Sequence, residues 1–346
     1  MLKFVLTKPY ALEVVDSPIP EPKAGEVLIK VARVGVCGSD PTIYRGNHPY
    51  VTFPVVMGHE YSGWVVKLGS DTNAPPVGTR VAVIPHLVCD MCVACKNEKS
   101  NFCESLRCTG AEADGAHCEY ICAPAKMVIP IPENMSLEDA AMVEPACVAY
   151  HGAKRASLTP SDRVLIIGAG PIGVFCMQSC KVLGAESVYI ADMDPWRLEL
   201  AKSLGADGII NVNEESLEEG LTRLTGSSKN IDVFYDCVGE KGVALNQILM
   251  LARRGTRIVV LGVLQNDYDL PNLPDFVQHE LSLFGTTMYV LQDYIDVIEL
   301  IGKGMIKTTG MISHTEQLAD LIKVFDMIEG KSEPFYKIML NVAEGL

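Results

Sequence analysis

The sequence predicts an α/β protein with two domains, one rich in β-strands and one built on a doubly wound parallel sheet. The length of 346 residues allows roughly two domains at about 150 residues each. Up to about residue 145, short apolar runs are broken by turn residues. From about Arg163 onward, apolar strands alternate with longer amphipathic stretches, a pattern typical of stacked βαβ units.

Composition narrows the class of protein. Hydrophobic residues make up 48% of the chain and charged residues 21%, as in a globular protein with a large core. The 29 Lys and Arg against 43 Asp and Glu give a net charge of −14, which would repel nucleic acid or an anionic membrane surface. The start lacks a signal-peptide pattern, and no stretch approaches about 18 uninterrupted apolar residues. We therefore expect a cytoplasmic protein that binds neither nucleic acid nor membrane.

The expected elements follow the chain in order. In the β-rich part, strands are expected at 13–15, 26–34, 63–68, 80–84 and 127–131. In the second part they are expected at 164–167, 188–191, 208–210, 231–236, 256–261 and 281–284, with crossover helices at 171–183 and 195–204. Six strands complete a doubly wound sheet.

The C-terminal segment does not fit into that sheet. Helices are expected at 293–303 and 317–329, followed by a strand at 336–340. Because six strands already complete the sheet, this last strand is expected to return to the β-rich domain. The predicted division is 1–145 with 286–346 for the β-rich domain, and 146–285 for the other.

A glycine-rich loop follows the first strand of the second domain. Its sequence, Gly168-Ala169-Gly170-Pro171-Ile172-Gly173, fits G-x-G-x-x-G and opens the first crossover helix. Gly168 would allow the tight turn, Gly170 the approach of a pyrophosphate, and Gly173 close packing of helix on strand. Pro171 and Ile172 would begin the helix whose N-terminus faces the phosphates. Because strand and helix flank the loop, a dinucleotide site is favoured over an unrelated glycine-rich turn.

The cofactor expected at this loop is NAD. Asp192 ends the second strand, about 20 residues beyond the loop, where a carboxylate accepts hydrogen bonds from the ribose hydroxyls. Its charge would repel the 2′-phosphate of NADP, and the next residue, Met193, supplies no cation. Arg197 is a candidate for stacking near the adenine. Gly262, after the fifth strand, is a weaker candidate contact.

Four of the twelve cysteines are closely spaced: Cys89, Cys92, Cys95 and Cys103. In a reducing compartment disulfides are not expected. Four thiolates complete a tetrahedral zinc shell with no open position, which predicts a structural zinc. The alternative is four thiols packed without metal, which rarely cluster so densely.

A second set of candidate ligands is dispersed along the chain. Cys37 lies in Cys-Gly-Ser-Asp, His59 and Glu60 in Gly-His-Glu, and Glu144 before Pro145. Each alone is a weak signal, since single Cys and His residues are commonly core residues. In this order, with the four-cysteine segment and the glycine loop, they resemble the zinc-dependent medium-chain alcohol dehydrogenases over the whole chain. Glu-Pro followed by Val148 and His151 is similar to the polyol dehydrogenase branch, which includes sorbitol (L-iditol) and galactitol-phosphate dehydrogenases.

The resemblance implies a GroES-like catalytic domain, a Rossmann NAD-binding domain and a dimer or tetramer. It also implies a catalytic zinc held by Cys37, His59 and either Glu60 or Glu144, with one open position, so that each chain would carry two zinc ions. Ser39 matches the hydroxyl residue that takes the first proton.

Two nearby positions bear on that site. Asp40 matches the residue that orients the zinc-binding histidine. Thr42 stands where the family often has a relay histidine, so the proton route beyond Ser39 stays open, with Tyr44 and His48 as candidates.

The implied reaction is reversible oxidation of a secondary alcohol to a ketone, with hydride transfer to NAD. The small-molecule substrate would be a polyol, a sugar-alcohol phosphate or a sugar acid. Met288 stands where sorbitol-type enzymes carry arginine, so the substrate itself stays open. A phosphate or carboxylate substrate would need cations, for which Arg45, Arg107 and Lys154 are candidates. Alternatives are a threonine or short-diol (butanediol) dehydrogenase and, more distantly, a catalytically silent NAD- and zinc-binding redox sensor.

Overall fold

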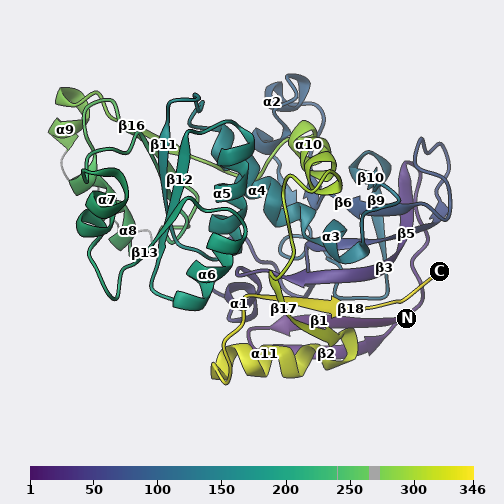
Figure 1. Cartoon of the computed structure of the whole chain (residues 1–346). Helices are drawn as coiled ribbons and strands as arrows, with labels where there is room; N and C mark the ends of the chain where they lie inside the picture. Colours follow the sequence, from purple (N-terminus) through teal and green to yellow (C-terminus); the bar gives the residue numbers. More distant parts are fainter. Residues whose placement is uncertain (240, 265–272) are drawn as a thin grey trace. The chain divides into compact units, whose positions relative to one another are not determined.

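The computed structural model describes residues 1–239, 241–264 and 273–346, which form two compact units (Figure 1). The first unit contains Met1–Glu144, Val290–Gly302 and Thr308–Leu346, and the second contains Pro145–Tyr289 and Lys303–Lys307. The predicted division places all of 286–346 in the β-rich domain, whereas residues 286–289 and Lys303–Lys307 belong to the second unit. Lys307 is instead tied to Gln178 of the second unit, because backbone and side-chain amide exchange two hydrogen bonds of 3.0 and 2.7 Å.

The first unit is rich in β-strands, as predicted, and most of its strand pairs are antiparallel. A three-stranded sheet has the order β2-β1-β4, and a seven-stranded sheet has the order β10-β6-β5-β3-β18-β17, with β9 also paired to β3. The strands are β1 (Leu2–Lys8), β2 (Ala11–Asp16), β3 (Glu26–Val36), β4 (Val55–Val56), β5 (Glu60–Leu68), β6 (Arg80–Val83), β9 (Tyr120–Pro124), β10 (Val128–Pro130), β17 (Ile312–Gln317) and β18 (Lys337–Asn341). A separate two-stranded ribbon pairs β7 (His86–Leu87) with β8 (Arg107–Cys108).

The last strand returns to this unit, as expected. β18 pairs antiparallel with β3 and parallel with β17. The helix expected over 317–329 begins later, because residues 312–317 alternate between half-buried and exposed positions and form β17. The helix that follows is α11 (Leu321–Gly330), which buries Leu321, Val324, Phe325 and Ile328.

Several short helices and the 12-residue helix α10 complete the first unit. They are α1 (Asp40–Tyr44), α2 (Val93–Lys96), η1 (Ser100–Phe102), η2 (Ala125–Met127), α3 (Leu137–Ala141), α10 (Leu291–Gly302) and η3 (Leu318–Asp320). The core lies where the inward-facing residues of β1, β3 and β5 meet α11, and it includes the buried Phe4, Val31, Tyr61 and Phe325.

The second unit confirms the predicted doubly wound sheet. Six parallel strands lie in the order β13-β12-β11-β14-β15-β16, the strand order of a Rossmann fold. They are β11 (Arg163–Ile167), β12 (Ser187–Asp192), β13 (Gly208–Asn211), β14 (Val233–Asp236), β15 (Arg257–Val260) and β16 (Ser282–Gly285). The helices are α4 (Val143–Lys154), α5 (Pro171–Val182), α6 (Pro195–Ser203), α7 (Leu217–Thr225), α8 (Val243–Leu251) and α9 (Leu273–Gln278).

Local chemistry fixes where these helices begin. The Asp194 carboxylate accepts from the Trp196 N–H group at the start of α6. Ser216 and Glu219 form a reciprocal capping box at the start of α7. α5 begins with Pro171, whose missing N–H group costs nothing at a first helical position. No helix among the described residues is both long and apolar enough to cross a membrane.

Candidate active site

Strand pairing brings three of the expected ligands together. Cys37 follows β3, and Glu60 begins β5 directly after His59; these two strands pair antiparallel with Gly35 opposite Glu60. The Cys37 sulfur, a His59 ring nitrogen and a Glu60 carboxylate oxygen all lie within 4.8 Å of one another. A side chain at position 35 would meet the Glu60 carboxylate at 2.2 Å, so the approach depends on Gly35.

The electrostatics of this cluster favour a bound cation. Asp40 is fully buried and accepts a 2.8 Å hydrogen bond from the Cys37 N–H group, while its other oxygen lies 3.7 Å from Nδ1 of His59. Burial lowers the pKa of His59, but the neighbouring Cys37 and Asp40 raise it more, to well above its ordinary value. The groups that attract a proton to this histidine would equally stabilise a divalent metal ion. A thiolate, an imidazole and a carboxylate are also the donors that zinc prefers.

Glu60 forms a buried ion pair with Lys337, a residue that the sequence did not single out. Lys337 of β18 donates to both Glu60 carboxylate oxygens, at 2.8 and 2.7 Å, and to the Val36 carbonyl at 3.2 Å. Both side chains are buried. Burial lowers the pKa of Lys337, but Glu60 and Cys37 raise it more, so the ammonium stays charged. The available signal was a single lysine beginning the otherwise apolar run of β18.

Glu144 lies near this cluster but does not join the close set of three. It sits in the first turn of α4 and is 5% exposed. Burial raises the pKa of Cys108 to about 12, and the charges of His59, Glu144 and Cys37 all act on that thiol. Glu60 and Glu144 therefore both remain candidates for the acidic ligand.

The three candidates for the proton relay, Ser39, Tyr44 and His48, have different surroundings. Ser39 precedes α1, and its hydroxyl makes no capping hydrogen bond to the helix. Tyr44 is a core residue, since its ring stacks on Phe325 at 4.7 Å and its hydroxyl points to the Tyr10 carbonyl at 3.4 Å. His48 lies within electrostatic reach of His59, so it is the better placed of the two for an onward route.

The four-cysteine segment also fits a metal. Its four sulfur atoms all lie within 4.8 Å of one another, and the Cys89 and Cys103 sulfurs are 3.5 Å apart, close to the edge of about 3.8 Å in a tetrahedral zinc–thiolate shell. The Cys92 N–H group donates to the Cys89 sulfur at 3.4 Å. Backbone N–H groups of Cys95 and Glu104 lower the pKa of Cys92 to about 6, which favours the thiolate form. None of the twelve cysteines forms a disulfide.

The glycine loop lies between β11 and α5, and each glycine occupies a position suited to its expected task. Gly168 has a φ of +100°, a conformation that L side chains rarely adopt. A Cβ at Gly173 would lie 1.8 Å from the Gly168 carbonyl oxygen, whereas a Cβ at Gly170 would meet nothing within 4 Å. The space beside Gly170 is therefore open for a ligand at the N-terminus of α5. Pro171 and Ile172 form the first residues of that helix.

Asp192 ends β12 next to this loop. Its carboxylate accepts from the Ala169 N–H group at 2.6 Å and from the Asp194 N–H group at 2.9 Å. Arg197 lies in α6, with its Nε 3.7 Å from the Asp194 carboxylate. Gly262 follows β15, where a Cβ would lie 2.2 Å from the Gly239 backbone nitrogen. These residues share the carboxyl end of the sheet, where ligands bind in such folds.

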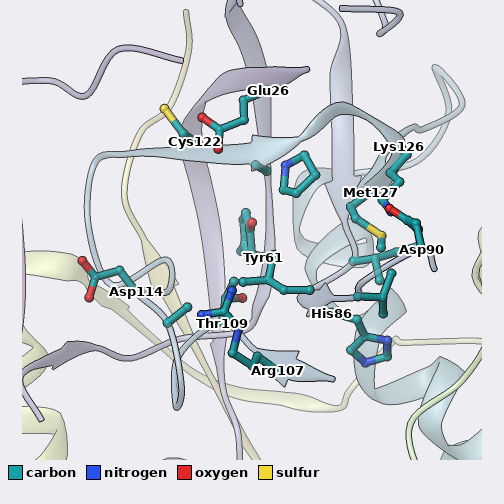
Figure 2. Close-up of a pocket in the computed structure, with 16 residues that line it drawn as sticks. Glu26, Tyr61, His86, Asp90, Arg107, Thr109, Asp114, Cys122, Lys126 and Met127 are labelled. Atoms are coloured by element: carbon teal, nitrogen blue, oxygen red, sulfur yellow. The ribbon is translucent and has the colours of Figure 1, made fainter. Parts of the chain in front are cut away.

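A separate cavity of about 410 Å³ in the first unit does not include the Cys37 cluster (Figure 2). Arg107 and Thr109 line it, together with His86 and Tyr61. Cys108, which lies between Arg107 and Thr109 in the chain, does not line this cavity. The charges of His59 and Cys37 act on its thiol. Because side chains alternate along an extended segment, Arg107 is expected to point away from the cluster.

Comparisons with known proteins agree with this geometry. The model of the alcohol dehydrogenase GroES-like domain matches residues 23–133, and that of zinc-binding dehydrogenases matches residues 171–303. Sorbitol dehydrogenase from Bacillus subtilis (strain 168) is 35% identical over 302 residues, which cover 86% of this chain and 84% of that protein.

Solved structures point the same way. A structure described as a short chain alcohol dehydrogenase (rspB) from E. coli CFT073, complexed with NADH, matches with a TM-score of 0.90 at 33% identity over 99% of both chains. Galactitol-1-phosphate dehydrogenase from Escherichia coli matches with a TM-score of 0.90 at 28% identity, covering 99% of this chain and 100% of that one. The resemblance inferred from the motifs is thereby confirmed, and the chain belongs to the polyol dehydrogenase branch of the zinc-dependent medium-chain alcohol dehydrogenases.

Proposed function

We propose that this enzyme uses zinc and NAD to oxidise a secondary alcohol of a polyol, a sugar-alcohol phosphate or a sugar acid reversibly to a ketone. The observation that carries the proposal is the convergence of the half-buried Cys37 with the buried His59 and Glu60, whose ligand atoms all lie within 4.8 Å of one another. Three protein ligands leave a fourth coordination position for substrate, as catalytic zinc sites require. When bound, zinc supplies Lewis acidity toward the substrate hydroxyl, and NAD accepts the hydride.

The side chains of the cluster have separate tasks in this proposal. Cys37 and His59 hold the metal with one carboxylate, from Glu60 or Glu144, and Asp40 orients the His59 ring through Nδ1. Ser39 takes the proton that leaves the substrate hydroxyl, since its own hydroxyl is not committed to capping α1. The second zinc, held by Cys89, Cys92, Cys95 and Cys103, orders the segment between β7 and β8.

The two carboxylates are distinguished by their environments. Both Glu60 oxygens already accept hydrogen bonds from Lys337. Glu144 sits at the N-terminal end of α4. Zinc content of Glu60→Gln and Glu144→Gln, measured by mass spectrometry after dialysis, identifies the ligand, because replacing the coordinating carboxylate by a neutral amide weakens zinc binding and should remove one equivalent of metal.

The second unit binds the cofactor in this proposal. The loop from Gly168 to Gly173 receives the pyrophosphate, Asp192 binds the adenosine ribose, and Arg197 and Gly262 complete the contacts. The Asp192 charge favours NAD over NADP.

The proposal includes a cytoplasmic location and a dimer or tetramer. Twelve cysteines without a disulfide suit a reducing compartment. Strand β16 lies at one edge of the parallel sheet, with Leu283 37% exposed, and unpaired edges favour pairing with a second copy.

The test is NADH formation, followed by absorbance, with sorbitol, galactitol, galactitol 1-phosphate, gluconate, 2,3-butanediol and threonine. Turnover of a sugar alcohol, its phosphate or a sugar acid supports the proposal. Turnover of threonine or butanediol alone would assign the protein to the alternative substrate classes. Absence of turnover across the panel with either NAD or NADP would favour the silent redox sensor.

A further inference from the structure

The segment after β8 packs against the backbone next to His59: a Cβ at Gly110 would lie 3.1 Å from the Gly58 nitrogen, and the Ala116 N–H group donates to the Gly58 carbonyl at 2.8 Å. Glu112 and Cys108 each donate a backbone hydrogen bond to the other. The Glu112 N–H group donates to the Cys108 carbonyl at 3.0 Å, and the Cys108 N–H group donates to Oε2 of Glu112 at 2.9 Å. Its other oxygen, Oε1, accepts no hydrogen bond within the described part of the chain. Glu112 is half-buried, so Oε1 is an acceptor without a protein partner.

This carboxylate belongs to the surroundings of the Cys37 cluster. The Cys108 thiol is acted on electrostatically by His59, Glu144, Glu112 and Cys37 together. These five groups therefore share one region of the first unit. Glu112 adds a negative charge to a region that already holds a thiol and a carboxylate.

His48 faces the same region from a different loop. It lies within electrostatic reach of both Glu112 and His59, and its loop is tied to the Glu112 loop by the Thr52 N–H group, which donates to the Ala111 carbonyl at 3.2 Å. Burial lowers the pKa of His48, which keeps its ring neutral near pH 7. Its Nδ1 accepts from the Tyr50 N–H group at 3.4 Å, which places the ring proton on Nε2. A donor from His48 and an acceptor from Glu112 match a hydroxyl group, which both donates and accepts.

The cations that would bind a phosphate or a carboxylate are engaged elsewhere. Arg45 pairs with Glu329 at 2.8 Å. Arg107 lines the cavity of Figure 2, whose lining does not include Cys37, His59 or Glu60. Lys337 is buried against Glu60. Lys154, the remaining candidate, lies in α4 with its ammonium 5.4 Å from the Tyr150 ring centroid. Because Glu60 neutralises Lys337, the carboxylate of Glu112 adds net negative charge to this region, which disfavours an anionic substrate.

We propose that Glu112 is a specificity-determining residue that selects neutral polyols over phosphorylated or carboxylated ones. Its free oxygen accepts a charge-assisted hydrogen bond from a substrate hydroxyl, and its charge repels a phosphate or carboxylate at the same position. The inference rests on the proposed function, and it narrows the three substrate classes of that proposal to one.

The experiment compares kcat/KM for matched pairs that differ only by the phosphate, galactitol with galactitol 1-phosphate and sorbitol with sorbitol 6-phosphate. Wild type should prefer the neutral member. Glu112→Gln keeps the shape but removes the charge, and it should reduce that preference by roughly tenfold or more. Dissociation constants of both members, measured by calorimetry with NADH present, should move in the same direction. Arg107→Ala should leave the preference unchanged, because that side chain faces the Figure 2 cavity.

Three results of these experiments would overturn the inference, and a fourth would overturn the proposed function as well. A wild-type preference for the phosphate, or an unchanged preference in Glu112→Gln with normal folding by circular dichroism, would overturn the inference while leaving the proposed function intact. Loss of phosphate turnover in Arg107→Ala would assign anion binding to that arginine and also overturn it. Absence of NAD-dependent turnover on every polyol, phosphate and sugar acid would overturn both proposals together.

Discussion

Lys337 donates hydrogen bonds to both carboxylate oxygens of Glu60, although the two residues are 277 positions apart in the chain. The pair joins β18 to the cluster of Cys37, His59 and Glu60. Because both side chains are buried, neither charge can be removed without leaving the other uncompensated.

Lys337→Met should therefore destabilise the protein strongly. Removing one partner of a buried ion pair typically costs about 3–5 kcal/mol, and the free energy of unfolding in urea measures this loss. The double variant Lys337→Met with Glu60→Gln should recover part of the stability, because it leaves no unpaired charge. Equal stabilities of the single and double variants would contradict the coupling of the two residues.

Two glycines of the cofactor loop should respond differently to alanine. Gly173→Ala places a Cβ 1.8 Å from the Gly168 carbonyl, so it should lower the melting temperature. Gly170→Ala meets nothing within 4 Å, so it should fold normally and instead weaken NADH binding roughly tenfold or more, measured by fluorescence titration. Unchanged NADH affinity in Gly170→Ala would show that the open space beside this residue is not the pyrophosphate site.

Asp192→Asn should weaken the preference for NAD over NADP. The variant keeps the size of the side chain but removes the charge that disfavours a 2′-phosphate. The ratio of kcat/KM for the two cofactors should fall roughly tenfold or more. A ratio equal to that of wild type would place the source of cofactor preference elsewhere.

His117 should make the protein sensitive to mild acid. It is fully buried, neither ring nitrogen has a partner among the described residues, and burial lowers its pKa to about 3 from an ordinary value of 6.5. Between those values the unfolded chain binds a proton that the folded protein does not. Stability is therefore complete above pH 6.5 and falls by about 1.4 kcal/mol for each pH unit below it.

His117→Leu removes this titration. The loss of unfolding free energy between pH 8 and pH 5 should shrink by about 2 kcal/mol relative to wild type. Urea denaturation at the two pH values measures it. The control is internal, because the other acid-sensitive groups, including His86 with its pKa lowered to about 4 by burial, are the same in both proteins. An equal loss in both proteins would contradict the assignment.

The sequence predicted the second unit well because its signals are local. Each strand of the parallel sheet is a short apolar run bounded by turn residues, and the loop from Gly168 to Gly173 joins a strand to a helix within a few residues. In the first unit the predictions were weaker. β1, β9 and β17 were missed, since their residues are mixed in polarity; β9 becomes a strand through pairing with β3, about 90 residues earlier in the chain.

Some residues of the candidate site could be predicted from the sequence, and others could not. The four closely spaced cysteines and the Gly-His-Glu motif are visible in the sequence. Lys337 and Glu112 are not, because their significance depends on contacts made only after the chain has folded. Single charged residues carry no periodicity or spacing that would single them out.

The central claim is that zinc at the Cys37 cluster is required for NAD-dependent oxidation of a sugar alcohol. Its most direct test is the rate of NADH formation by wild type before zinc removal with a chelator, after removal, and after zinc is restored, with Cys37→Ser assayed in parallel. We predict that the rate is lost with the metal, returns with zinc in wild type, and stays absent in Cys37→Ser. A rate that survives complete zinc removal, or full activity in Cys37→Ser, would contradict the account.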